Sequence, residues 1–231
     1  MVREELTTKG CLFGHLSDIN PSLIEELDKL KSIRNPENFT RVTHSYHKSV
    51  PYEATSTDSY DEAEKVKNMH LERNKDGKLW QTFFTWNTDN NQTSHLKMSL
   101  IPTMRNLFLE VFKYGYGEEM MDKIWEINES NTNLTHFNKD CWIDPHADGG
   151  GERMVCNILI YLNDDWKEED GGELVIAGAG NQQPLFGNFA ILDFMHVNPM
   201  HSVTPIKTED FHRYTILTGI LLEENYFNSI I

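Results

Sequence analysis

Residues 143–154 read IDPHADGGGERM and place His146 and Asp148 two positions apart. Side chains i and i+2 of an extended segment point to the same face, so this imidazole and this carboxylate can converge on one point. Two ligands hold a transition metal poorly, and His201, at the start of the later segment HSVTPI, is the candidate for a third. Two histidines and one carboxylate on one side of a metal leave positions open on the other. That arrangement suits a non-haem Fe(II) that must bind both a co-substrate and oxygen.

The spacing of these residues alone leaves alternatives to a metal site open. An HxD pair arises often by chance, and the imidazole and carboxylate could be ordinary surface groups. His196 competes with His201 for the third position, although it lies in a connection that contains Asn and Pro.

A second pair with alternating spacing predicts a receptor for a carboxylate. Arg213 and Thr215 lie two apart in RYTILTGILL, so a guanidinium fork and a hydroxyl share one strand face. Along RMVCNILIYLN, the residues Asn157, Leu159 and Tyr161 share a face by the same alternation. If that face points inward, the Tyr161 hydroxyl can serve the same carboxylate. Alternation does not decide which face is inward, and Arg213 as a surface cation stays an open alternative.

Short segments rich in β-formers must position these side chains. They begin near residue 131 and are separated by Gly, Asp, Asn and Pro: NLTHF, RMVCNILIYLN, GGELVIAG, FGNFAILDF, HSVTPI and RYTILTGILLE. Six such strands indicate a β-sandwich or a barrel. We expect an α+β fold with one domain over residues 1–231, in which residues 131–222 form the barrel and helices within residues 1–130 buttress it.

The N-terminal part has mainly helical patterns. Residues 19–33 predict an amphipathic helix with Asn20 as N-cap and Pro21 at its first position. Further expected elements are helices at 61–73, 94–115 (with a kink or boundary at Pro102) and 118–128, a strand at 79–87, and a polar loop at 35–60 that is a candidate lid.

Bulk properties narrow the class of protein. The formal net charge of −15 gives a surface that repels phosphate backbones, which disfavours nucleic-acid binding. The three cysteines have no CxxC spacing and are expected to be free thiols. The N-terminus has no apolar signal region and no run approaches the ~18 apolar residues of a membrane span, so we expect a cytoplasmic protein.

Four pieces in order carry a resemblance to a known family: PHAD, ILIYLNDDWKEEDGGELVI, HSVTPI and RYTILTGILL. Together they resemble the Fe(II)- and 2-oxoglutarate-dependent dioxygenases, in the prolyl 4-hydroxylase-like branch, over about residues 131–222. The resemblance implies a double-stranded β-helix, that is, a jelly-roll or cupin-like barrel in the C-terminal half. It implies three iron ligands and three residues that hold 2-oxoglutarate: His146, Asp148 and His201 for Fe(II), and Arg213, Tyr161 and Thr215 for the co-substrate. O2 is then the second co-substrate, with ascorbate as a candidate auxiliary reductant.

Departures within the resemblance refine the expected reaction. Related halogenases have a small residue where this chain has Asp148, so hydroxylation or desaturation is favoured over halogenation. Prolyl 4-hydroxylases proper often have lysine at the position of Arg213, and arginine fits the wider branch. Many relatives have tyrosine where this chain has Phe137. The expected primary substrate is a prolyl residue of a peptide or protein; the alternatives are a free amino acid or small metabolite, and, in another class, a non-redox cupin-like binding protein.

Overall fold

The computed structural model describes residues 2–45, 79–86, 91–127, 132–139, 141–148 and 153–224. The helices and 3-10 turns are α1 (Val2–Lys9), α2 (Leu16–Ile19), α3 (Ser22–Asp28), η1 (Lys29–Ile33), η2 (Pro36–Asn38), α5 (Asn91–Tyr116), η3 (Glu118–Lys123) and η4 (Glu168–Asp170). The strands are β1 (Cys11–His15), β2 (Phe39–Ser45), β3 (Leu79–Trp86), β4 (Ile124–Glu126), β5 (Thr132–Phe137), β6 (Trp142–His146), β7 (Met154–Tyr161), β8 (Leu174–Ile176), β9 (Gly180–Gln182), β10 (Asn188–Asp193), β11 (His201–Val203) and β12 (Arg213–Leu222).

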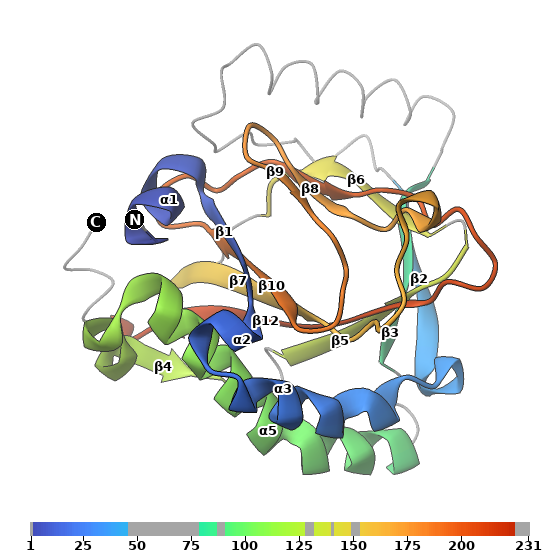
Figure 1. Cartoon of the computed structure of the whole chain (residues 1–231), viewed down its shortest axis with the longest axis horizontal. Coiled ribbons are helices and arrows are strands. Elements are labelled where there is room, and N and C mark those ends of the chain that lie inside the picture. Colours follow the sequence, from blue (N-terminus) through green and yellow to red (C-terminus); the bar gives the residue numbers. More distant parts are fainter. Residues whose placement is uncertain are drawn as a thin grey trace.

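The described strands form one 12-stranded sheet that folds back on itself. The order along it is β1-β10-β7-β12-β5-β3-β6-β11-β8-β9, with β2 added to β3 and β4 added to β12. Neighbouring strands run antiparallel, for example β7 beside β10 and β12 beside β5. In Figure 1, β6, β8 and β9 face β7, β10 and β12 across the molecule, and α3 and α5 cover the outer side of the second group.

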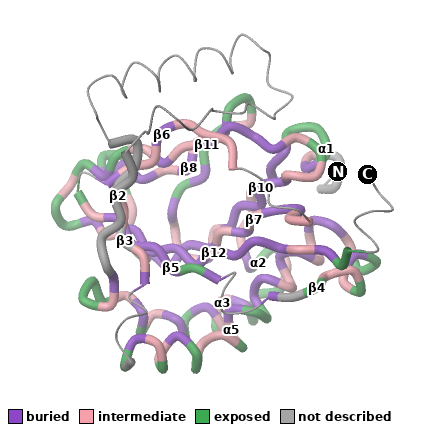
Figure 2. The backbone as a smooth tube through the Cα atoms, turned by 180° about the vertical axis from the view of Figure 1, so that it is seen from behind, coloured by how far each residue is buried: buried purple, intermediate pink, exposed green. Residues whose placement is uncertain are grey.

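Alternation along β7 and β12 separates an outer core from the barrel interior. Ile158 and Ile160 of β7 and Ile216 of β12 are fully buried in the hydrophobic cluster that includes the helices. The intervening residues of β7 face the other way, because successive side chains of a strand alternate. A second apolar cluster fills the interior with residues such as Phe137, Leu174 and Leu192. Figure 2 shows these central strands as mostly buried.

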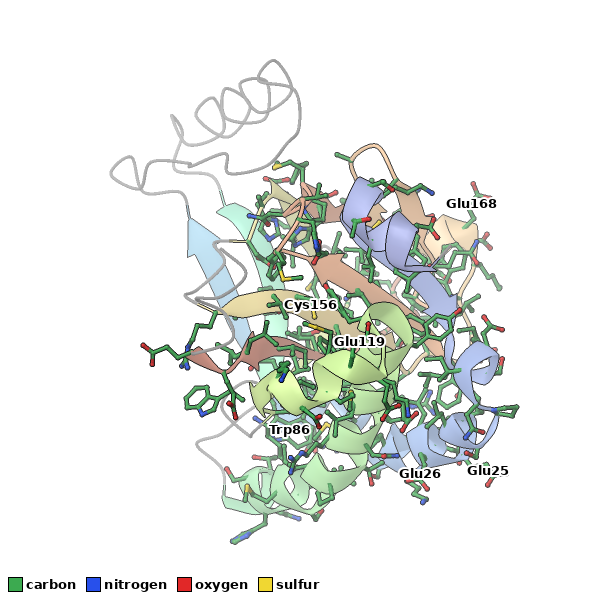
Figure 3. The ribbon with its side chains drawn as sticks, turned by 90° about the vertical axis from the view of Figure 1, so that its left-hand side faces the viewer. Glu25, Glu26, Trp86, Glu119, Cys156 and Glu168 are labelled. Carbon is green, nitrogen blue, oxygen red and sulfur yellow. The ribbon has the colours of Figure 1, made fainter. Side chains whose placement is uncertain are left out.

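Helix α5 supplies the largest apolar face against the sheet. Its fully buried residues recur at helical spacing: Met104, Leu107, Phe108, Val111 and Phe112. The helix runs unbroken through Pro102. Close to its start, the Trp86 indole donates to the backbone carbonyl of Thr93 at 3.0 Å, which ties β3 to α5 (Figure 3). None of the described helices is long and apolar enough to cross a membrane.

The six expected C-terminal strands are confirmed as β5, β7, β8, β10, β11 and β12, and the strand expected at 79–87 as β3. The N-terminal region differs more. The helix expected at 19–33 is divided into α2, α3 and η1, with Pro21 rather than Asn20 at the N-cap of α3. The Asn20 side chain instead accepts a hydrogen bond from the Ser22 backbone at 3.1 Å.

Two further expectations for the N-terminal half are wrong. In place of the helix expected at 118–128, residues 118–126 form the 3-10 turn η3 and then strand β4, because Ile124 and Glu126 pair with the end of β12. The expected loop at 35–60 contains η2 and β2, and β1, β2 and β3 all join the sheet, so strands are not confined to the C-terminal half. The remainder of that loop, with its candidate lid, and the helix expected at 61–73 lie outside the described residues.

Candidate active site

The two histidines of the expected metal site meet across a strand pair. β6 and β11 are antiparallel neighbours, and His201 lies directly opposite His146 in their register. The two ring centroids are 4.3 Å apart. Asp148 follows two residues after His146, just beyond the end of β6, so its carboxylate reaches the same point. One donor atom from each of His146, Asp148 and His201 lies within 4.8 Å of the other two.

Backbone carbonyls fix which nitrogen of each histidine faces the site. His146 Nδ1 lies 2.9 Å from the Asp144 carbonyl oxygen, and His201 Nδ1 lies 3.0 Å from the Pro199 carbonyl oxygen. A carbonyl only accepts, so Nδ1 carries the proton in both rings and Nε2 is left with a lone pair. The two Nε2 atoms lie 3.4 and 3.6 Å from Asp148 Oδ1 and Oδ2.

This donor set fits a metal cation. Three lone-pair-bearing atoms converge with no proton between them, an arrangement that is repulsive until a cation binds. Burial tends to raise the pKa of the Asp148 carboxyl, but His146, His201 and the Asn157 amide together hold it well below its usual range. Burial, followed by the proximity of His146, lowers the pKa of His201 to about 4. The carboxylate is therefore ionised and the imidazole neutral near pH 7, which are the forms that bind metal.

Arg213 is a buried cation with aromatic neighbours. It is 1% exposed at the start of β12, and its guanidinium carbon lies 4.7 Å from the ring centroid of Phe137 and 5.1 Å from that of Tyr161. Among the described residues, its Nε and Nη2 atoms have no hydrogen-bond partner. Burial lowers its pKa, but Tyr161 opposes that shift. The open alternative of a surface cation is therefore wrong.

Two buried hydroxyls accompany this guanidinium. Tyr161 and Thr215 are direct cross-strand partners of β7 and β12, and both are nearly inaccessible to solvent. Neither hydroxyl has a hydrogen-bond partner within the described parts of the chain. The Tyr161 hydroxyl is close enough to Arg213 for the cation to influence its pKa, which burial nevertheless raises, but the pair does not reach hydrogen-bond geometry. Buried donors left unpaired in this way are costly unless a ligand completes them, and a carboxylate would satisfy all three groups.

One cavity joins the histidines, Asp148 and Arg213. Its volume is about 210 Å³. Besides these four residues its wall is mostly apolar, with Phe83, Phe137, Ile143, Leu159, Leu174, Leu192, Val203 and Leu217, together with Thr135 and Asn157. The face of β7 that carries Asn157 and Leu159, whose orientation the alternation left open, thus points inward. Tyr161 and Thr215 do not line the cavity itself but lie behind it, beside Arg213.

The segment DWKEEDGGEL packs against Arg213 and against the residues that lead into β12. Asp170 accepts hydrogen bonds from the Thr208 hydroxyl at 2.5 Å and the Lys167 backbone at 2.9 Å. Gly172 has a φ of +78°, and a Cβ there would lie 2.4 Å from Ile206 Cδ1 and 3.3 Å from Arg213 Cδ. Glycine therefore lets this turn pack against the segment that leads into β12.

His196, the competing candidate, is held elsewhere. Its backbone N–H donates to Asp193 Oδ2 at 3.0 Å, and its ring Nδ1 lies 2.7 Å from the same oxygen. Asp193 also accepts from the Tyr116 hydroxyl at 2.7 Å. His196 therefore braces the turn between β10 and β11.

Two asparagines that contact Asp148 were not assigned a role from the sequence. Asn157 Nδ2 donates to Asp148 Oδ2 at 2.8 Å, and Asn198 Nδ2 donates to the Asp148 backbone carbonyl at 3.0 Å. The alternation in β7 that placed Asn157 beside Leu159 and Tyr161 was the available signal. Nothing in the spacing pointed to Asn198.

Comparison with known proteins agrees with this geometry. Residues 132–219 match the family model of the 2OG-Fe(II) oxygenase superfamily. No curated protein sequence matches the chain. Solved structures do match, at low sequence identity and with nearly full coverage. A Pseudomonas putida prolyl-4-hydroxylase is 14% identical with a TM-score of 0.55, over 96% of this chain and 97% of that one.

Two further solved structures have the same architecture. A prolyl hydroxylase from Trichoplax adhaerens, in complex with a peptide fragment of the hypoxia inducible factor oxygen degradation domain, is 13% identical with a TM-score of 0.52, over 100% of this chain and 90% of that one. A 2OG-Fe(II) oxygenase family oxidoreductase from Burkholderia pseudomallei is 11% identical with a TM-score of 0.55, over 95% of this chain and 89% of that one.

These matches confirm the α+β jelly-roll fold and the resemblance found in the sequence. They place the chain among enzymes, so the alternative of a non-redox cupin-like binding protein is not retained. Residues 132–219 thus carry a similarity to the 2OG-Fe(II) oxygenase superfamily, and the chain shares the fold of prolyl 4-hydroxylases; enzymes of this kind use Fe(II), 2-oxoglutarate and O2, and the cluster of His146, Asp148 and His201 suits the iron.

Proposed function

We propose that this enzyme hydroxylates an unactivated C–H bond, with a prolyl residue of a peptide or protein as its primary substrate. In this proposal His146, Asp148 and His201 hold Fe(II). Three further residues hold the distal carboxylate of 2-oxoglutarate: Arg213, Tyr161 and Thr215. The observation that carries the proposal is that one cavity is lined both by the converging metal-binding atoms of His146, Asp148 and His201 and by a buried guanidinium whose Nε and Nη2 have no hydrogen-bond partner among the described residues.

Each of these side chains has a task that follows from its contacts. When bound, Fe(II) supplies the oxidation of a C–H bond by O2, coupled to the decarboxylation of 2-oxoglutarate to succinate. Arg213 binds and orients the co-substrate by pairing with a carboxylate, and the flanking rings of Phe137 and Tyr161 keep its guanidinium plane in place. The apolar wall that includes Leu159 and Leu192 excludes water from the reacting centre.

The size of the cavity bears on the primary substrate. A volume of about 210 Å³ accommodates a small dicarboxylate beside a metal. A polypeptide that presents one side chain at the mouth is compatible with a cavity of this size. The structural neighbour from Trichoplax adhaerens was solved with a peptide fragment, which also supports a peptide substrate.

The same proposal treats residues 1–231 as one domain, with residues 1–130 as a mainly helical support and lid region and residues 131–222 as the barrel core. Its support is that β1, β2 and β3 pair with strands of the C-terminal half in a single sheet.

Succinate release tests the reaction and the substrate together. With Fe(II), 2-oxoglutarate and O2, we expect proline-containing peptides to stimulate succinate formation and free amino acids to have little effect. Stimulation by free amino acids or small metabolites, and not by peptides, would establish the alternative of a metabolite hydroxylase.

Asp148→Ala tests the metal site independently of the substrate. Removing the carboxylate leaves two histidines, so we expect bound iron and substrate-dependent succinate release to be lost. Turnover near that of the wild-type enzyme in this variant would show that the triad is not the metal site.

A further inference from the structure

Asn157 makes a direct contact with the proposed metal-binding carboxylate. It lies on the inward face of β7, and its Nδ2 donates to Asp148 Oδ2 at 2.8 Å. β7 and β6, which leads to Asp148, are not neighbours in the strand order and face each other across the barrel, so this hydrogen bond joins opposite walls (Figure 1).

This hydrogen bond distinguishes the two oxygens of Asp148. Oδ2 accepts the amide proton, whereas Oδ1 lies 3.4 Å from the unprotonated Nε2 of His146. A carboxylate beyond the end of a strand can otherwise rotate about its side-chain torsions. The amide contact therefore holds the group with Oδ1 toward His146 before any metal is present.

The sheet keeps Asn157 itself in place. It pairs with Leu192 of β10 on one side and with Gly219 of β12 on the other. A Cβ at residue 219 would lie 3.3 Å from Asn157 Oδ1, so glycine there leaves the room that the amide occupies. A side chain confined on both sides can hold a ligand in one orientation.

Asn198 holds the same residue through its backbone. Its Nδ2 donates to the Asp148 carbonyl oxygen at 3.0 Å, and its own backbone N–H donates to the Asp193 carbonyl oxygen at 2.8 Å. Asn198 has a φ of +49°, a conformation that asparagine tolerates better than most residues. Asp148 is thus fixed at its main chain from the turn before β11, which leaves its carboxylate for Asn157 to orient.

We infer that Asn157 is a positioning residue that acts through Asp148 and sets the orientation of the metal-binding carboxylate. The inference rests on the proposed role of Asp148 as a metal ligand. Partners that hydrogen-bond a metal ligand orient it and tune its affinity, and their loss typically costs about 10- to 100-fold in metal binding.

Asn157→Leu removes the donor while keeping a similar volume, and Asn188→Leu is a matched control. Asn188 is also half-buried in a strand and donates one side-chain hydrogen bond, to the Gln183 carbonyl at 3.0 Å, but does not line the cavity. Metal-free protein is titrated with Co(II), whose visible absorption reports both the dissociation constant and the coordination geometry. Thermal unfolding of the metal-free variants measures the structural cost of each change.

We expect Asn157→Leu to raise the Co(II) dissociation constant about 10-fold or more and to change the visible spectrum. Asn188→Leu should leave both at the wild-type values. A dissociation constant within about twofold of the wild-type value, with an unchanged spectrum, overturns the inference. If Asn157→Leu does not accumulate as folded protein, Asn157→Ala replaces it under the same criteria. Failure of the wild-type protein to bind Co(II) would instead contradict the proposed function.

Discussion

Arg213 carries a charge beside two aromatic rings, and its Nε and Nη2 atoms have no hydrogen-bond partner in the described parts of the chain. Arg213→Ala should therefore raise the apparent KM for 2-oxoglutarate. A hydrogen bond to a charged group contributes about 1.5–3 kcal/mol, which corresponds to roughly a 10- to 100-fold increase. Succinate release as a function of 2-oxoglutarate concentration measures this change.

Arg34→Ala is the control for this prediction. Arg34 donates to the Leu162 carbonyl at 2.9 Å and to Asp164 at 2.7 Å, away from the cavity. Its loss should affect stability and leave the KM for 2-oxoglutarate unchanged. An unchanged KM in Arg213→Ala would assign the co-substrate carboxylate to another residue.

Residue spacing predicted which side chains form the candidate site. It did not predict the hydrogen bonds that orient them. The i, i+2 rule was sufficient to pair His146 with Asp148 and Arg213 with Thr215, because the second pair lies within β12 and Asp148 directly follows the end of β6. The carbonyl contacts that fix the histidine tautomers come from Asp144 and Pro199 and depend on local backbone geometry. The contact of Asn198 with Asp148 joins two loops and has no periodic signal.

At the scale of elements, the turn after η4 determines how the chain approaches β12. Gly171 has φ +71° and ψ −154°, a region that is essentially reserved for glycine. A Cβ there would lie 2.1 Å from the Pro205 carbonyl oxygen, which is backbone and cannot move cheaply. The Trp166 indole also donates to the Gly171 carbonyl at 2.7 Å, so the turn has little freedom to shift.

Gly171→Ala should therefore destabilise the protein by at least about 2 kcal/mol, from backbone strain and the steric clash together. For a chain of this size that loss lowers Tm by about 4–8 °C. Gly178→Ala separates the two causes, because Gly178 also has a positive φ, +74°, with nothing within 4 Å of its Cβ position. Thermal unfolding should show a clearly smaller loss for Gly178→Ala, and equal losses would contradict the clash.

Strands whose sequence contains alternating or continuous β-formers were predictable from the sequence. Short strands that depend on pairing with a neighbouring strand were not. The segments of β7, β10 and β12 are apolar enough to indicate strands on their own. By contrast β1, β4 and β6 have five residues or fewer, and pairing with longer strands stabilises them. The same applies to the expected helix at 118–128, where pairing with β12 outweighed local propensity.

The whole molecule places its apolar mass on both faces of one sheet, with the helices outside and the candidate site inside. The outer hydrophobic cluster contains buried residues of α5 and the outward-facing residues of β7 and β12, so packing against the helices stabilises the barrel wall on its outer side. Figure 2 shows the strands of this wall as mostly buried. In Figure 3, Cys156 lies in the interior between strand and helix, whereas Glu25, Glu26 and Glu168 point outward. The charged side chains of the candidate site, Asp148 and Arg213, are thus enclosed in an otherwise apolar barrel, where a charge without a partner is costly.

Ligands that pair those interior charges should stabilise the entire fold. A ligand that binds only the folded state at 100 times its dissociation constant contributes about 2.7 kcal/mol, which corresponds to roughly 5–11 °C in Tm for a chain of this length. We expect Mn(II) and 2-oxoglutarate, each at about 100 times its dissociation constant and without O2, each to contribute a rise in Tm of about that size.

Two variants separate the contribution of Mn(II) to this rise in Tm from the contribution of 2-oxoglutarate. Asp148→Ala should lose the part due to Mn(II), because it removes the charged metal ligand, and Arg213→Ala should lose the part due to 2-oxoglutarate. Scanning calorimetry with each ligand alone and with both measures the two parts, and Arg34→Ala provides a reference with an intact cavity. An unchanged Tm of the wild-type protein with Mn(II) and 2-oxoglutarate would contradict both assignments. The cluster of His146, Asp148 and His201 would then not bind the metal, and Arg213 would not bind the co-substrate.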